Sequence, residues 1–334
     1  MKKQNKITKE FIERIKSGDR AALAQAITLL ESNAPNHSDL GSELIRNISP
    51  PPEHSIRIGI TGLPGAGKST FIDSFGVFLC DRAHRVAVLA VDPSSPVSKG
   101  SILGDKTRME KLSKNSMAFI RPSPSGTNTG GVTKKTRESI LLCEAAGFDR
   151  IIIETIGVGQ SETAVQSMVD FFLLILLPGA GDELQGIKKG SVELADAIII
   201  NKADADSERL AKITQNQYQN AIHLIHPSEK DWSVPVLTCS ATEGKGIHEV
   251  NDIINKFIEQ VKASGKFEEN RRKQLLDWMY SMIEDNLKRE FYQNKEIISQ
   301  IPKLENEILL GHITPEAAAA ELLKRFLQSS IVKS

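Results

Sequence analysis

The sequence lacks net charge, long apolar runs and paired cysteines. Lys and Arg together number 42, as do Asp and Glu, so no net field draws nucleic acid or anionic lipid to the chain. The longest apolar run, FFLLILL at Phe171–Leu177, is far shorter than the about 20 residues that span a membrane. We therefore expect neither a nucleic-acid partner nor a membrane-spanning segment.

Cysteine usage and the first residues both favour a cytoplasmic location. The three cysteines, Cys80, Cys143 and Cys239, form no CxxC motif, and each has apolar neighbours, which indicates buried thiols in a reducing compartment. The opening MKKQNKITKEFIERIKSGD has neither the apolar core of a signal peptide nor the Arg/Ser richness of a transit peptide. We expect a soluble, cytoplasmic protein.

Changes in hydrophobic periodicity divide the 334 residues into three parts. Residues 1–50 have apolar positions at helical spacing and end at a run of prolines, so they predict an N-terminal helical extension. Residues 51–262 alternate short apolar runs with helical patterns, and residues 263–334 show only helical patterns.

The short apolar runs predict a doubly wound α/β domain. Their residues are apolar without alternation, as in parallel strands that helices cover on both faces, and such sheets bind ligands beyond the carboxyl ends of their strands. The predicted strands are Ile56–Ile60, Val86–Val91, Met117–Ile120, Ile151–Glu154, Phe171–Leu177, Ala197–Ile200 and Val234–Cys239.

The C-terminal arm is predicted to contain two amphipathic helices. One covers RRKQLLDWMYSMIEDNLKREFY, and in the other, ITPEAAAAELLKRF, Thr314 is placed to cap the helix with Pro315 in its first turn. The apolar stripes of these helices must pack either on the main domain or on a second copy of the chain. We favour the second, which makes the arm a dimerisation element of a homodimer.

A glycine-rich loop follows the first predicted strand and precedes a helical pattern. GLPGAGKST fits G-x-x-x-x-G-K-[ST], in which glycines let backbone N–H groups face a phosphate and the helix dipole adds positive charge. Lys68 would bridge the β- and γ-phosphates and Ser69 would ligate Mg²⁺. The alternative is a glycine turn with a chance Lys-Ser. The predicted nucleotide-binding residues here are Gly62, Leu63, Pro64, Gly65, Ala66, Gly67, Lys68, Ser69 and Thr70.

Two later segments favour guanine over adenine. AIIINKAD ends a buried strand with Asn201, Lys202 and Asp204, and the Asp204 carboxylate can accept both the N1–H and the 2-amino hydrogens of guanine, which adenine does not offer. Lys202 would cover the base plane and Asn201 would brace the loops. After the last strand come Ser240, Ala241 and Thr242, where a backbone N–H can meet the guanine carbonyl. A strand end that enters a turn would explain NKAD alone, but together the segments predict GTP, with ATP as the weaker alternative.

Three acidic residues are candidates for a Mg²⁺ site with Ser69. Asp92 and Glu154 end two predicted strands and Asp105 lies in ILGDKTRM, and Mg²⁺ prefers oxygen ligands while it keeps several waters. Taken singly, each residue also has a structural explanation: an Asp-Pro turn for Asp92, a helix cap for Asp105 and an exposed strand end for Glu154. Gly157 is placed to let a backbone N–H reach the γ-phosphate, whereas Gln160 is offset too far to be preferred as the catalytic group.

Taken together, these motifs resemble the MeaB/ArgK family, the GTPases associated with methylmalonyl-CoA mutase that were once described as arginine/ornithine transport ATPases. The resemblance covers residues 50–260 closely, and Lys106 and SGTNTGG depart from the usual wording. The motifs that carry it are GLPGAGKST, VDPSSP, GDKTRM, RPSPS, ETIGVGQSE, PGAGDELQGIKKG and NKAD.

The resemblance implies slow GTP hydrolysis to GDP, with the nucleotide state gating adenosylcobalamin delivery to methylmalonyl-CoA mutase and protecting that enzyme. It also implies that residues 179–190 form a third switch, in which Lys188 neutralises charge on the phosphates. Without the family resemblance, the same segment would be interpreted as a solvated turn. The implied catalytic residues are Lys68, Glu154, Gln185 and Lys188, and Asp182 and Glu183 also match the family's positions.

Three other functions stay open from the residues alone. A nickel-delivery GTPase shares the predicted architecture, although its metal sites need clustered soft or imidazole ligands and the seven histidines here are dispersed. A P-loop kinase linked to amino-acid transport is disfavoured by the guanine-reading pattern. A nucleotide-binding scaffold without turnover is disfavoured by the intact Lys68, Ser69, Asp92 and Glu154.

Overall fold

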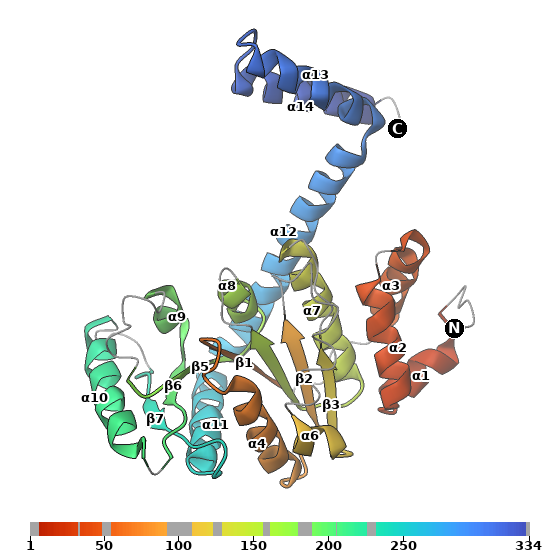
Figure 1. The fold of residues 1–334 in the computed structure, drawn as a ribbon. Coiled ribbons are helices and arrows are strands. Elements are labelled where there is room, and N and C mark those ends of the chain that lie inside the picture. Colours follow the sequence, from red (N-terminus) through yellow and green to blue (C-terminus); the bar gives the residue numbers. More distant parts are fainter. Residues whose placement is uncertain are drawn as a thin grey trace. The chain divides into compact units, whose positions relative to one another are not determined.

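A computed structural model of the chain describes residues 7–32, 34–48, 55–91, 109–122, 129–155, 161–179, 189–204, 206–225 and 232–331. Within these residues a seven-stranded sheet is flanked by helices, and all of its strand pairs are parallel (Figure 1). The predicted α/β class is confirmed. The strands are β1 (Ile56–Gly62), β2 (Val86–Val91), β3 (Ala118–Pro122), β4 (Arg150–Thr155), β5 (Phe171–Leu176), β6 (Ala197–Ile200) and β7 (Val236–Thr238).

The strand order β3-β2-β4-β1-β5-β6-β7 creates a topological switch point beside β1. The helix after β1, α4 (Lys68–Cys80), leads to β2 on one side, whereas α8 (Ser161–Gln166) after β4 leads to β5 on the other. Ligands of doubly wound sheets bind where such connections diverge. The remaining helices of this region are α6 (Glu110–Lys114), α7 (Thr129–Ala145), α9 (Lys189–Leu194), α10 (Glu208–Ile225) and α11 (Ile247–Ala263).

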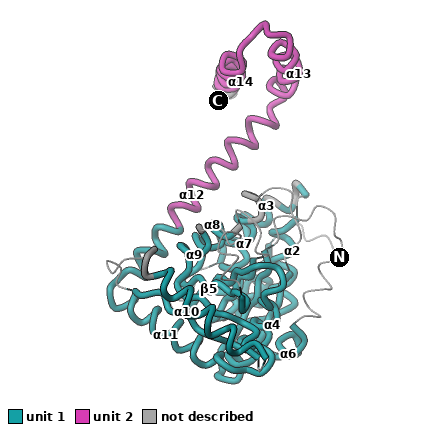
Figure 2. Tube along the Cα trace, turned by 60° about the vertical axis from the view of Figure 1, so that its left-hand side comes forward, with its two compact units in different colours: residues 1–274 teal, residues 275–334 magenta. Residues whose placement is uncertain are grey.

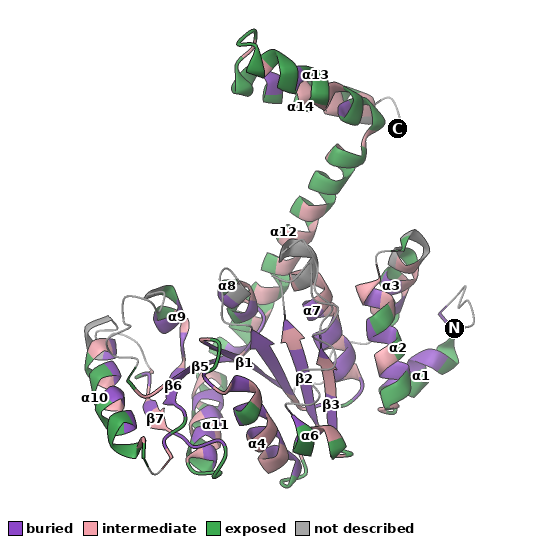
Figure 3. Cartoon of the chain, viewed as in Figure 1, coloured by how far each residue is buried: buried purple, intermediate pink, exposed green. Residues whose placement is uncertain are grey.

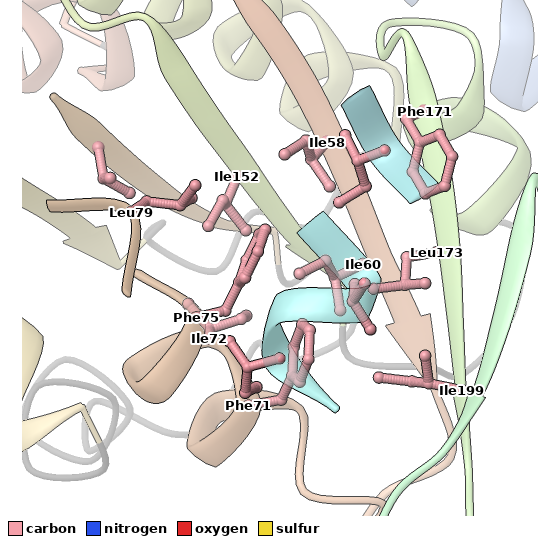
Figure 4. Packing of buried hydrophobic residues seen from close by; sticks show 14 of the residues in the cluster. Ile58, Ile60, Phe71, Ile72, Phe75, Leu79, Ile152, Phe171, Leu173 and Ile199 are labelled. Carbon is pink, nitrogen blue, oxygen red and sulfur yellow. The ribbon is translucent and has the colours of Figure 1, made fainter. Parts of the chain in front are cut away.

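Successive strand residues point to opposite faces of the sheet, and each face has its own hydrophobic core. On the first face, Ile58, Ile60 and Ile152 pack with Phe71 and Phe75 of α4, as Figure 4 shows. On the second face, the neighbouring residues of β2 and β4 pack against α7 and the N-terminal helices. Because both faces are covered, the strands are apolar without alternation, as the sequence predicted.

The N-terminal helices share the second-face core. They are α1 (Lys9–Lys16), α2 (Arg20–Glu31) and α3 (Pro35–Asn47). Ile15, Leu23 and Ile27 are fully buried in the same cluster as Ile151 and Ile153 of β4. Capping by Asp19, whose side chain accepts from the Ala21 and Ala22 amides, starts α2.

The chain divides into two compact units, Met1–Gln274 and Leu275–Ser334 (Figure 2). The division falls inside α12 (Lys266–Gln293), the long helix predicted over residues 271–292. The domain boundary that the sequence suggested, between residues 262 and 263, stays a prediction.

The second unit contains a helical hairpin of α13 (Lys295–Leu309) and α14 (Pro315–Ile331). Thr314 caps α14 as predicted, because its Oγ1 accepts from the Ala317 amide at 3.2 Å. The sequence analysis did not identify α13, which contains Pro302. Many residues of α12–α14 are exposed (Figure 3).

Within the described residues, no helix combines the length and the apolar character that crossing a membrane requires.

Candidate functional site

The candidate site lies at the carboxyl ends of the strands near the switch point. Strand β1 runs directly into the glycine-rich loop, and the neighbouring strand β4 carries Glu154 near its end. Strands β6 and β7, also neighbours, are followed by Asn201 and by Ser240. The parallel sheet thus brings segments more than 170 positions apart to one edge.

Two glycines of the loop have backbone requirements that other residues do not meet. At Gly62 a Cβ would lie 2.2 Å from the carbonyl oxygen of Ile175 in the neighbouring strand. Gly67 has φ +86°, and its Cβ would lie 2.6 Å from Asn201 Nδ2. The loop can therefore follow this path only with glycine at both positions.

The loop leads directly into the first turn of α4, where backbone N–H groups have no acceptor within the helix itself. The helix begins at Lys68, and Gly67 at its N-cap has no side chain with which to satisfy them. Inside the loop, Lys68 Nζ donates to the carbonyl oxygens of Gly62 at 2.7 Å and Leu63 at 3.2 Å. An ammonium beside the amino end of a helix fits a polyphosphate.

Ser69 and Glu154 meet across the sheet edge. Glu154 has the same orientation as Ile152, so it points to the face that α4 covers, and Ser69 Oγ donates to Glu154 Oε1 at 2.9 Å. Glu154 is buried with 8% exposure. A hydroxyl and a buried carboxylate oxygen this close fit Mg²⁺, which binds one or two protein oxygens and completes its shell with phosphates and waters.

No three His, Cys, Asp or Glu side chains gather as metal ligands in the described part of the chain. The Ser69–Glu154 pair is thus a partial ligand set, suited to an ion that a nucleotide helps to hold.

Asn201 connects the glycine-rich loop with the segment after β7. Its Nδ2 donates to the Ala66 carbonyl at 2.9 Å, and its Oδ1 accepts from the Ala241 amide at 3.3 Å. Asn201 is buried with 1% exposure. Lys202 follows with φ +60°, a left-handed conformation that non-glycine residues rarely adopt, and its Cε lies beside Gly67. Asn201 thus contacts both segments, whereas the base-covering role of Lys202 stays a prediction.

Asp204 accepts hydrogen bonds from two hydroxyls of the SAT segment. Ser240 Oγ donates to Asp204 Oδ1, and Thr242 Oγ1 reaches the same oxygen at 3.3 Å. The carboxylate thus stands beside the segment that the sequence predicted as the second base-reading element. The sequence predicted that a backbone N–H of this segment meets the guanine carbonyl. In the structure the Ala241 amide donates to Asn201 Oδ1.

The other predicted site residues divide into two groups. Pro64 and Thr70 are exposed, as is Gly65. The rest lie outside the described residues: Asp92, Asp105, Gly157, Gln160, Asp182, Glu183, Gln185 and Lys188.

The sequence analysis missed a buried polar chain beside the loop. Thr155 Oγ1 donates to Thr61 Oγ1 at 2.8 Å, Thr61 Oγ1 donates to Glu162 Oε1 at 3.3 Å, and Ser191 Oγ donates to Glu162 Oε2. The one signal in the sequence was Thr61, directly before the first glycine of the loop. Only the fold brings Thr155, Glu162 and Ser191 together with it.

The strand–loop–helix, the part-buried Ser69–Glu154 pair and Asn201, which bonds to the loop, define a P-loop nucleotide-binding protein. Residues 23–296 match the model of the family described as "Methylmalonyl Co-A mutase-associated GTPase MeaB". The chain belongs to this family and is a GTPase, so the resemblance seen in the motifs is confirmed.

Similar proteins agree over most of the chain. A "Putative GTPase" of Caulobacter vibrioides is 52% identical over 94% of this chain and 96% of its own length. The "GTPase ArgK" of Escherichia coli is 47% identical, over 86% and 87%. A crystal structure of a "LAO/AO transport system kinase" has 37% identity and a TM-score of 0.76, and covers 96% of this chain and 99% of its own.

Proposed function

We propose that GTP and GDP bind at the glycine-rich loop, with the guanine read by Asp204. The backbone amides at the start of α4 and the Lys68 ammonium would hold the phosphates. Asp204 would exchange its hydroxyl donors for the two hydrogen-bond donors of guanine, and Ser240, Ala241 and Thr242 would line the base. The observation that carries this proposal is the meeting of the loop with Asn201, which joins the phosphate and base segments in one site.

We propose that Ser69 and Glu154 are the Mg²⁺ ligands among the described residues, with Asp92 and Asp105 as further candidates outside them. The ion, when bound, would supply positive charge to the β- and γ-phosphate oxygens. For Ser69 this means an exchange, because its hydroxyl now donates to Glu154. Lys68 would stabilise the leaving phosphate charge, and Glu154 would hold the ligand shell in place.

Calorimetry with guanine and adenine nucleotides tests the site. Wild type should bind GTP and GDP, with ATP weaker by at least about 10³-fold, because a buried carboxylate without donors is costly. Lys68→Ala should lose GTP binding and turnover, whereas Lys212→Ala, an exposed lysine of α10, should leave both unchanged. Preference for ATP, as expected of a transport-linked kinase, would contradict the proposal.

We further propose that the nucleotide state gates adenosylcobalamin delivery to methylmalonyl-CoA mutase and protects that enzyme. The family's description as mutase-associated, together with the match over residues 23–296, supports the partnership. A GTPase with slow intrinsic turnover suits such gating, since the bound nucleotide then persists until the partner responds.

Transfer of adenosylcobalamin to apo-mutase would test this role. Transfer should differ between the GTP- and GDP-bound protein, and the mutase should raise GTP turnover. Lys68→Ala serves as the control that abolishes nucleotide dependence. If binding and turnover were both indifferent to the mutase, the partnership would be wrong while the GTPase assignment stood.

For the third switch we propose that Lys188 and Gln185 support partner-stimulated hydrolysis. Both lie outside the described residues, so the proposal rests on their match to the family motif. Lys188→Ala should lose the stimulation by the mutase and keep the intrinsic rate. Unchanged stimulated turnover would reject the role.

We propose that the second unit makes the protein a homodimer. Along α12, Leu276, Tyr280, Ile283 and Leu287 are each about half exposed, at 47–60%. Their spacing of four, three and four residues is that of a coiled-coil seam, which needs a second helix to cover it. A second copy of the chain offers an identical seam.

Sedimentation of the full chain tests the seam. Wild type should sediment as a dimer, and Leu276→Glu combined with Ile283→Glu should give monomers, because charges in the seam oppose its burial. Lys288→Glu, a charge change at an exposed neighbouring position of the same helix, is the control. A double variant that stayed dimeric would place the dimer contact elsewhere.

A further inference from the structure

A buried carboxylate, Glu162, stands at the centre of the polar chain beside the phosphate loop. It lies in the first turn of α8 and is 9% exposed. Thr61 and Thr155 are fully buried and Ser191 is 4% exposed. Thr155 donates to Thr61, and Thr61 and Ser191 both donate to Glu162. The carboxylate is therefore the final acceptor of both sets of hydrogen bonds.

The partners of Glu162 are unusual for a buried acid. In the part of the chain that the structure describes, both of its side-chain hydrogen-bond partners are neutral hydroxyls. Burial of a carboxylate has a large cost in solvation free energy, which a cation partner normally offsets. The N-terminal turn of α8 compensates only in part, since the dipole of so short a helix is small.

The opposite end of the sheet provides a contrast within the same molecule. There the buried Glu144 pairs with Arg57 Nε at 2.8 Å and lies 3.4 Å from Arg271 Nη1. The fold thus places arginines beside a buried acid where only structure is needed. Among the described residues only hydroxyls bond to Glu162, and stabilisation of the fold is a poor explanation for that choice of partners.

Two of the three hydroxyls come from segments at the nucleotide site. Thr61 directly precedes Gly62, the first residue of the phosphate loop, and Thr155 directly follows Glu154. Ser191 belongs to α9 and bonds to the other carboxylate oxygen of Glu162. One carboxylate therefore links β1, the end of β4, α8 and α9 by hydrogen bonds at the edge where the phosphates would bind.

We propose that Glu162 is a positioning residue for GTP hydrolysis, which sets the phosphate loop and Glu154 relative to α8 and α9 through Thr61, Thr155 and Ser191. This inference rests on the proposed nucleotide site. Glu162 acts through Thr61 and Thr155 and not on the nucleotide itself, so its loss displaces groups that matter in the transition state. Small displacements of this kind lower kcat more than they weaken substrate binding.

Steady-state GTP hydrolysis of the full-length protein tests the proposal. Glu162→Gln keeps the side-chain shape but removes the charge, and should lower kcat about tenfold while KM for GTP stays within about twofold. Ser191→Ala removes one donor and should lower kcat by about threefold, whereas Ser191→Thr retains the hydroxyl and should restore the wild-type rate. Thr163→Ala, an exposed hydroxyl in the same helix, is the matched control and should not change kcat.

The double variant separates positioning from general destabilisation. If Ser191 acts through Glu162, Ser191→Ala should lower kcat no further once Glu162→Gln is present. Additive losses, a rise in KM at constant kcat, or failure of Ser191→Thr to restore the rate would each overturn the proposal.

Ser191→Ala also keeps the test open if Glu162→Gln fails to fold, since it removes only one hydroxyl. Lys68→Ala distinguishes a failure of the positioning role of Glu162 from a failure of the proposed nucleotide site. A dead Lys68→Ala with normal Glu162→Gln would reject only the positioning role, whereas normal hydrolysis by Lys68→Ala would reject the nucleotide site itself.

Discussion

The carboxylates at the two ends of the sheet have different kinds of hydrogen-bond partner. At the amino ends of the strands, Glu144 and Asp170 are paired with arginines. At the carboxyl ends, Glu162 and Asp204 accept hydrogen bonds from serine and threonine hydroxyls. Both kinds of environment satisfy the carboxylate, but they differ in how strongly they hold it.

The amino-end cluster joins three parts of the chain. Arg57 of β1 makes a bidentate pair with Glu144 of α7, with both distances 2.8 Å, and Arg271 of α12 pairs with Asp170. Burial acts to raise the pKa of Glu144, but the hydrogen bonds and charge of Arg57 and the charge of Arg271 outweigh it and hold that pKa below its ordinary value. The cluster fastens the start of α12 to the first unit.

The difference shows which end is scaffold and which end can exchange partners. Charge-assisted bidentate bonds are about twice as strong as neutral ones, and breaking them leaves two buried charges. A hydroxyl can rotate away and bond elsewhere at small cost, which suits positions where a ligand must replace the internal partner. Asp204 is the clearest example, because in the proposed site guanine donors would take the place of its two hydroxyls.

The largest effect is expected at the amino end, from Glu144→Gln. It leaves Arg57 buried without its counter-ion, so the free energy of unfolding should fall by about 3–5 kcal/mol. Denaturant titration of the full chain measures this, with the exposed Glu259→Gln of α11 as the control. The folded variant should bind GTP with the affinity of wild type. A lower affinity in the fully folded variant would show that the amino-end cluster also affects the nucleotide site.

The contribution of Glu144 should also depend on pH. Its folded-state pKa is lowered, so the ion pairs stabilise the protein above the ordinary value of 4.5 and are lost as the pH falls through the lowered pKa. The stability difference between wild type and Glu144→Gln should therefore be constant at neutral pH and shrink below pH 4.5. A difference that grew on acidification would contradict this sign.

At the carboxyl end, Asp204→Asn should alter purine selection. The amide presents a donor to the guanine 2-amino group, so GTP affinity should fall by about a hundredfold. Xanthosine triphosphate carries a carbonyl at that position and should bind the variant better than it binds wild type. Calorimetry with both nucleotides checks this exchange, and equal GTP affinity in the two proteins would mean that Asp204 does not read the base.

A smaller effect is expected from Asn201→Ala. The variant loses the bonds to Ala66 and Ala241, so the phosphate and base segments are no longer joined, and GTP affinity should fall about tenfold. The exposed Asn216→Ala of α10 is the control. Weakened ATP discrimination alone, at unchanged affinity, would assign Asn201 to the base and not to the junction.

The smallest effect should come from Ser55→Ala at the amino end. Ser55 Oγ donates to Glu144 Oε1 at 2.6 Å, but the arginines remain when it is removed. The free energy of unfolding should fall by about 1 kcal/mol with GTP turnover unchanged. A loss as large as that of Glu144→Gln would show that the hydroxyl, and not the ion pairs, stabilises this cluster.

Features with a local cause were predicted well from the sequence. The strands follow from unbroken apolar runs, the phosphate loop from its glycines, and the cap of α14 from Thr314. The helix α13 was overlooked because a proline inside a pattern argues against a helix, yet Pro302 is accommodated there.

Features that depend on distant partners were not predicted. Arg271 is 101 positions from Asp170, and Thr61 is the same distance from Glu162, so neither pairing leaves a periodic signal. Whether a polar residue is a solvated side chain or a buried one depends on which neighbour the sheet supplies. Sequence reasoning assigned no role to Glu162, although its segment was part of the family motif.

The sequence by itself determined the fold class, the phosphate loop and the family, because each of these depends on short runs of residues whose backbone or chemistry allows few alternatives. Only the tertiary structure decided which carboxylates meet arginines and which meet hydroxyls. That choice depends on side-chain direction and on strand order, and both arise only when the parallel sheet aligns segments far apart in the chain.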